Sequence, residues 1–172
     1  MTERSDNRNN IINERNQFDK LVKISLIIGI IVISGFIIYY LLTPEPGYVT
    51  FGILNSDKKA EDYPTNATVG ENISFYISVG NYLKRDFKFQ VEILKGDNNT
   101  LLTSTGSVNA TSYFNTSITS LNHKMHWTSE ILNISFSQPG TNQILIAELK
   151  EIEIALKETF IEIIWLRFNI TT

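Results

Sequence analysis

The two histidines are the side chains of this chain best suited to ligate a metal ion, since imidazole is a common ligand. They form the pair His123-Lys-Met-His126. On a β-strand this spacing puts the two rings on opposite faces, and the sequence indicates no third ligand. The chain has no cysteine, which excludes thiolate zinc sites, iron–sulfur sites and thiol nucleophiles. We therefore expect surface histidines, no metal site and no cofactor.

An acidic segment at residues 55–62 offers possible oxygen ligands for Ca²⁺ in Asp57, Glu61 and Asp62. Two lysines lie in the middle of the segment, and the Asp-x-Asp-x-Asp-Gly order of a calcium loop is missing. The sequence favours a solvated, hydrogen-bonded turn over an ion site and does not decide between them.

Carboxylates are also numerous near the C-terminus, where a pair of them could act as in a glycosidase. The five residues are Glu148, Glu151, Glu153, Glu158 and Glu162. We interpret them as the outward positions of edge strands, where charge discourages sheet-to-sheet aggregation. No Gly-x-Ser-x-Gly, His-Glu-x-x-His, phosphate-loop or dinucleotide-binding motif occurs. We therefore expect no catalytic residues, and a protein that is not an enzyme.

Asn-x-Ser/Thr motifs, the acceptors of N-linked glycans, are the most frequent chemical signal in the chain. The seven motifs begin at Asn66, Asn72, Asn98, Asn109, Asn115, Asn133 and Asn169. Residues 43–172 hold 12 Asn and 26 Ser or Thr, so chance gives about 12 × 26/130, or 2.4 motifs. The segment 1–23 has five Asn and no motif. The pattern predicts a glycosylated domain outside the cytoplasm, beginning after residue 42.

The segment 24–42 is uncharged and reads ISLIIGIIVISGFIIYYLL. As a helix it spans roughly 28 Å, close to the thickness of the bilayer hydrocarbon. A signal peptide, the main alternative, has a shorter apolar region and a small-x-small cleavage site. We predict an uncleaved transmembrane anchor. Its small-xxx-small pair, Ser25 and Gly29, either supports helix association or reflects the ordinary composition of membrane helices.

The distribution of charge predicts the orientation of this anchor. Five basic residues precede it, with Lys20 and Lys23 at the helix entrance, and no Lys or Arg follows until Lys58. The positive-inside rule therefore places residues 1–23, expected as a disordered tail, in the cytoplasm. The expected localisation is the cell membrane, crossed once, with the C-terminal domain extracellular. The net charge is −3 overall and −4 after the helix, which argues against nucleic acid as a partner.

Beyond the anchor, the proline-rich segment 43–47 reads as a stiff linker to a β domain at 48–172. Alternating hydrophobic residues predict strands at 73–79, 87–93 and 132–136, with further strands at 48–54, 143–149, 152–156 and 161–170. Two weaker strands are expected between Leu101 and Leu121. Turn motifs at 63–66, 69–72, 95–98 and 138–141 separate the strands. About eight short strands predict an all-β, immunoglobulin-like antiparallel β-sandwich, with Trp127 and Trp165 packing in its core or rim unless an exposed ring stacks on sugar.

Several segments give this domain a more specific resemblance. They are Tyr48–Leu54, Lys59–Asn72, Gly80-Asn81, Trp127, the turn Gln138–Asn142 and the closing Trp165–Asn169. Together they resemble the outer domain of an archaeal membrane-protein family catalogued as domain of unknown function 1616. The resemblance implies an archaeal source and an immunoglobulin-like exterior domain, and it supplies no catalytic residues. Longer members of that family have several N-terminal membrane helices, whereas this chain has one.

The function expected from the sequence is that of a membrane-anchored cell-envelope protein. Membrane lipid surrounds its helix, and its glycosylated domain contacts other envelope or membrane proteins or glycans. The alternative is an accessory subunit of a membrane enzyme or transporter, whose partner supplies the activity.

Overall fold

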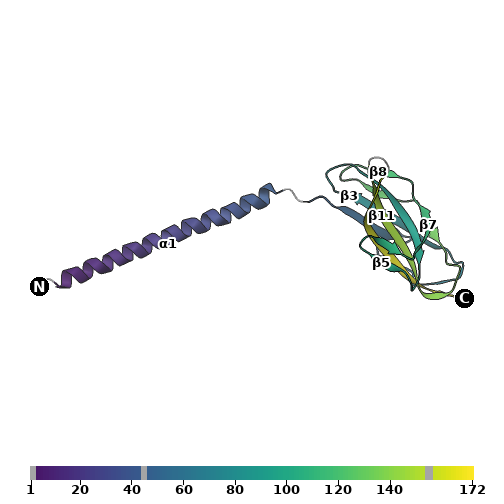
Figure 1. Cartoon of the computed structure of the whole chain (residues 1–172), viewed down its shortest axis with the longest axis horizontal. Coiled ribbons are helices and arrows are strands. Elements are labelled where there is room, and N and C mark those ends of the chain that lie inside the picture. The colour runs from purple at the N-terminus through teal and green to yellow at the C-terminus, as the bar shows by residue number, and fades with distance from the viewer. Residues whose placement is uncertain (1–2, 44–45, 154–156) are drawn as a thin grey trace. The chain divides into compact units, whose positions relative to one another are not determined.

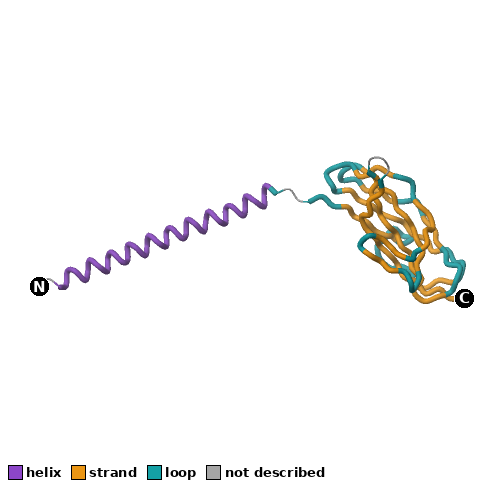
Figure 2. The backbone as a smooth tube through the Cα atoms, in the orientation of Figure 1, coloured by secondary structure: helices purple, strands orange, loops and turns teal. Residues whose placement is uncertain are grey.

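The computed structural model describes residues 3–43, 46–153 and 157–172 of the chain. It contains two compact units, Met1–Glu45 and Pro46–Thr172. The first holds one long helix and the second is built of strands (Figure 1, Figure 2).

Helix α1 runs from Glu3 to Leu42, and its part from Gln17 to Leu42 is 26 residues long and apolar enough to cross a membrane. Its large apolar side chains are exposed on all sides of the helix in the unit itself, as they are for Ile27, Ile31 and Phe36. The last turn is closed by Thr43, whose backbone N–H and hydroxyl both donate to the carbonyl of Tyr39 (2.9 and 2.7 Å). A helix that is apolar all round requires an apolar surrounding, which a bilayer provides.

The helix begins earlier than the sequence analysis predicts. The tail at residues 1–23 was expected to be disordered, but the described part of it, from Glu3, is helical. No Pro or Gly occurs between Glu3 and Ile28, so nothing in the chain interrupts the backbone hydrogen bonds. Extending an existing helix also avoids the unfavourable nucleation step that a separate tail would face.

The β domain has two facing sheets. The four-stranded sheet contains β1 (Val49–Leu54), β3 (Ile73–Asn81), β9 (His126–Thr128) and β10 (Leu132–Ile134), with β9 and β10 sharing one edge of β3. The six-stranded sheet contains β2 (Asn66–Thr68), β12 (Glu158–Thr171), β11 (Gly140–Ile152), β4 (Phe87–Gly96), β7 (Thr111–Asn115) and β8 (Thr119–Leu121). All pairings within these sheets are antiparallel except that of β2 with β12.

A third element, the hairpin β5 (Leu101–Thr103) and β6 (Gly106–Val108), packs on the larger sheet. Leu102 of this hairpin contacts a small cluster formed by Leu94, Ile144 and Ile146. These three residues alternate with those that face the other sheet, so the hairpin covers the outer face of the six-stranded sheet.

The core lies between the two sheets. Phe75 and Ile77 of β3 and Phe89 and Val91 of β4 are at most 1 % exposed, as their alternation with polar residues predicts. The ring of Phe89 meets Trp127 of the opposite sheet edge-on, with 5.4 Å between centroids. Trp127 is half-buried in this packing, whereas Trp165 is exposed.

The structure confirms the predicted all-β, immunoglobulin-like sandwich. The chain passes between the sheets at β1–β2, β2–β3, β3–β4, β8–β9 and β10–β11, which gives the two-sheet strand distribution of that fold. Strand details differ from the prediction. Four strands, not two, lie between Leu101 and Leu121, and β2 and β9 were not predicted. A separate strand was expected at 152–156, but its first residue, Ile152, is the last residue of β11. Residues 154–156 lie outside the described part of the chain.

The domain has two ends, which we call the near end, where the chain enters β1, and the far end, where the C-terminus lies. At the near end the chain enters β1, and Gly47 lies against Leu83, where an added Cβ would be 2.6 Å from the Leu83 Cα atom. At the far end lies the C-terminus. In a turn at this end the backbone N–H of Gly70 donates a hydrogen bond to the carbonyl of Phe136 (2.9 Å). Figure 1 shows β8 toward one end of the domain and the C-terminus at the other.

Candidate functional site

All seven Asn residues of the predicted glycosylation motifs have exposed side chains. They are Asn66, Asn72, Asn98, Asn109, Asn115, Asn133 and Asn169. The domain has two buried Asn residues among those described, Asn55 and Asn81, and neither begins a motif. Every motif therefore presents its acceptor amide to solvent, which is a geometric requirement for a bulky surface glycan.

The motifs gather in the half of the domain that includes the far end. Asn66 and Asn169 are direct neighbours on β2 and β12, with 3.4 Å between the Asn169 Nδ2 and Asn66 Oδ1 atoms. Asn133 pairs with Ser74 near the start of β3, and its Oδ1 accepts a hydrogen bond from the serine hydroxyl (2.7 Å). Asn115 lies opposite Glu92, in the middle of β4. The loops of the near end carry no motif.

The histidines lie at the near end and have separate partners. His126 Nε2 is 2.7 Å from the hydroxyl of Tyr82, whose ring stacks on Tyr48 with 4.8 Å between centroids. His123 Nδ1 accepts the backbone N–H of Lys84 (3.1 Å). Among the described residues no group of three or more His, Asp or Glu side chains converges as metal ligands would.

The acidic segment 55–62 is organised by a buried amide. The Asn55 Oδ1 atom accepts hydrogen bonds from the backbone N–H groups of Asp57 (2.9 Å) and Lys59 (3.0 Å). Its Nδ2 donates to the carbonyl of Glu61 (2.8 Å). These bonds support the hydrogen-bonded turn that the sequence favours.

Glu148 faces outward from the sandwich as predicted, but its interpretation as a charged residue on an edge strand is wrong. This carboxylate is 6 % exposed on β11, which lies between β12 and β4 in the larger sheet. The hairpin β5–β6 covers it, and Ser107 donates to its Oε1 from both the backbone N–H (2.5 Å) and the hydroxyl (2.6 Å). Local sequence could not place the hairpin over this position, since Ser107 and Glu148 are 41 residues apart.

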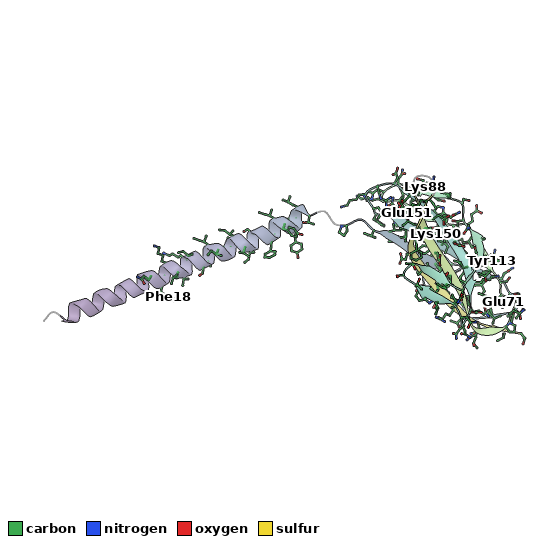
Figure 3. The ribbon with its side chains drawn as sticks, in the orientation of Figure 1. Phe18, Glu71, Lys88, Tyr113, Lys150 and Glu151 are labelled. Carbon is green, nitrogen blue, oxygen red and sulfur yellow. The ribbon has the colours of Figure 1, made fainter. Side chains whose placement is uncertain are left out.

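The other glutamates are partly engaged in ion pairs. Arg85 forms a two-pronged contact with Glu151 and thereby has its pKa raised above the ordinary value. The Lys150 Nζ atom lies 2.6 Å from Glu92 Oε2 and 3.5 Å from Glu158 Oε2. Burial acts to raise the pKa of Glu92, but hydrogen bonds and the charge of Lys150 outweigh it and the pKa is lowered. Figure 3 labels Lys150 and Glu151 on β11.

A polar pocket of about 230 Å³ opens between turns that the sequence analysis treats separately. Its lining includes Lys95 at the end of β4, Asp97 after it, Asn109 before β7, and Gln138 and Gln143 around the start of β11. The two turns are tied together by a hydrogen bond from Asn142 Nδ2 to Asn98 Oδ1 (3.0 Å).

Lys95 is the one cationic side chain among the described residues that line this pocket. Its Nζ lies 3.9 Å from the ring centroid of Tyr113 and 5.7 Å from that of Phe136. Burial lowers the pKa of Lys95 below its usual value. The sequence alone does not reveal this pocket, because Lys95-Gly-Asp-Asn98 predicts only a turn.

Comparison with known proteins finds no match among curated proteins. The crystal structure of the CARDB domain of the PF1109 protein from Pyrococcus furiosus, in complex with di-metal ions, is similar at a TM-score of 0.47 and 15 % identity, over 75 % of this chain and 97 % of that one. A β-glucosidase from Listeria innocua is similar at a TM-score of 0.47 and 9 % identity, but the match covers only 16 % of that chain. A family model described as a domain of unknown function, DUF1616, matches residues 43–146. This chain therefore belongs to the DUF1616 family.

Proposed function

We propose that this protein is a single-pass protein of the cell membrane that displays a glycosylated immunoglobulin-like domain outside the cell, for contact with other envelope proteins or glycans. The observation that carries the proposal is the exposure of all seven motif asparagines, while the two buried ones lie outside motifs. Exposed motifs on a β domain that follows an apolar helix are the arrangement of a surface glycoprotein.

The charges beside the helix support the proposed orientation. Lys20 and Lys23 precede the apolar part of α1, while the exit is followed by Thr43 and no basic residue until Lys58. Cytoplasmic flanks of membrane helices carry such an excess of Lys and Arg. The N-terminus is therefore assigned to the cytoplasm and the β domain to the outer side.

The contacts of the carboxylates support a non-enzymatic role. Glu148 accepts two hydrogen bonds from Ser107, and Glu151 is held by both guanidinium nitrogens of Arg85. These carboxylates bind other parts of the domain, which is a structural use of their charge. Binding and display then remain as the activities of the domain, and its partners are proteins or glycans of the envelope.

Limited proteolysis of intact cells tests the orientation. Added trypsin is expected to digest the β domain and to leave Arg4, Arg8 and Arg15 uncut, because the membrane shields the cytoplasmic side. Mass spectrometry of the peptides measures this, and permeabilised cells serve as the control in which the three sites become cut. Cleavage at these arginines in intact cells shows the opposite orientation.

Intact-glycopeptide mass spectrometry of the protein from its native source tests the glycans. We expect sugar on Asn72, Asn98, Asn109 and Asn133, since each has an exposed side chain on a strand or turn. The buried Asn81 is an internal control and should be unmodified. If all seven motif residues are bare, the glycosylated display role is rejected.

A further inference from the structure

Lys95 is a half-buried cation without an anionic partner. No carboxylate of the described residues lies within ion-pairing distance of its Nζ. Its Nζ lies over the rings of Tyr113 and Phe136, which attract a cation through the ring quadrupole. A ring face is not an oxygen or nitrogen acceptor for the N–H donors of the ammonium group. The ammonium group thus keeps donors available on the side of the pocket.

The remaining lining offers neutral hydrogen-bonding groups. The side-chain amides of Gln138 and Gln143 have no hydrogen-bond partner among the described residues. Each can both donate and accept, as hydroxyl groups of a ligand require. Phe136 adds an apolar wall. The volume, about 230 Å³, corresponds to roughly eight waters at about 30 Å³ each, which is enough for one sugar ring.

We propose that this pocket binds one residue of an acidic sugar, whose carboxylate pairs with Lys95 and whose hydroxyls bond to Gln138 and Gln143. Asp97 lines the same pocket, and its Oδ1 accepts the backbone N–H of Asn99 (2.8 Å). Because a carboxylate is already present, a singly charged sugar acid fits better than a doubly charged phosphate. A neutral sugar leaves the charge of Lys95 uncompensated and binds more weakly.

The sugar has two possible sources with the same chemistry. Asn109 lines the pocket and begins a glycosylation motif, so a glycan on its amide starts at the rim. The other source is a separate saccharide of the envelope. The proposal deepens the proposed contact with glycans and depends on the proposed glycosylation only for the first source.

The binding test uses the full chain in detergent micelles, produced in a host without N-glycosylation. Glucuronate is titrated against glucose while the side-chain amide signals of Gln138 and Gln143 are followed by NMR. We expect glucuronate to shift both signals with a Kd on the order of 1 mM, and glucose to bind more weakly. Lys95→Gln should weaken glucuronate binding about tenfold, because a charge-assisted hydrogen bond is lost.

Matched variants make the result decisive. Lys95→Arg, which keeps the charge, should retain most of the affinity. Lys88→Gln, an exposed change on the same strand, should leave it unchanged. Absence of shifts with glucuronate, equal binding of glucose, or an equal loss in Lys88→Gln overturns the proposal.

The same titration on the natively glycosylated protein separates the two sources. If added glucuronate no longer binds and Asn109→Gln restores binding, the chain's own glycan fills the pocket. If binding persists, the ligand is a separate saccharide. If the native protein carries no glycan at any motif, the glycosylated display role is rejected. The titration of the unglycosylated chain tests the pocket independently of that result.

Discussion

Replacing Phe89 by Ala is expected to lower the free energy of unfolding of the β domain by about 3–5 kcal/mol. Phe89 has no exposed surface, and its ring lies 5.4 Å from both Phe87 of the same strand and Trp127 of the opposite sheet. The truncation removes this cross-sheet contact and leaves a cavity that the packed core cannot close. Since domains of this size have stabilities of about 5–15 kcal/mol, one change removes a large part of the total.

Urea denaturation of the full chain in detergent micelles measures this loss, followed by tryptophan fluorescence, because Trp127 and Trp165 both lie in the β domain. The control is Lys88→Ala, on the exposed face of the same strand, with an expected loss below about 0.5 kcal/mol. Gln90, the other neighbour, is a poorer control, since its Nε2 donates to the carbonyl of Thr116 (2.8 Å). Equal losses for Phe89→Ala and Lys88→Ala would contradict the strand orientation.

Replacing Asn81 by Ala is expected to cost roughly 2–4 kcal/mol, since the buried carbonyl of Leu121 costs about 1–3 kcal/mol when it loses its partner and two part-buried backbone groups cost less. The side chain is fully buried at the near end, where its Nδ2 donates to the carbonyls of Arg85 and Leu121 (2.7 Å each). Its Oδ1 accepts the backbone N–H of Leu83 (2.9 Å). Alanine supplies none of these bonds.

The same denaturation experiment measures this effect, with Asn115→Ala as the matched control. Asn115 is exposed on β7, so its loss in unglycosylated protein is expected to stay below about 0.5 kcal/mol. Asn81→Asp is a second informative variant. It keeps the size of the side chain but replaces the donor by an oxygen facing two carbonyl groups, so its loss should be at least as large as that of alanine. A near-neutral Asn81→Ala would contradict the assigned role.

Much of this architecture follows from local sequence. The period-two alternation around Phe75 and Phe89 predicts both strands and the side of each that is buried, because successive side chains in a strand point to opposite faces. The apolar segment 24–42 predicts a helix by length and composition alone. Motif asparagines are exposed because they fall on turns and on the polar phase of strands, which is also a local property.

What the sequence by itself determined is therefore the helix, the main strands, their buried faces and the exposed motif positions. The tertiary structure alone decided which distant segments meet. Glu148 is buried because a hairpin some 40 residues earlier folds over the larger sheet, and the Lys95 pocket exists because the turns at 95–98 and 138–141 lie together. Periodicity records the environment of one residue relative to its neighbours, whereas such contacts depend on sheet order and on loop packing, which no local pattern encodes.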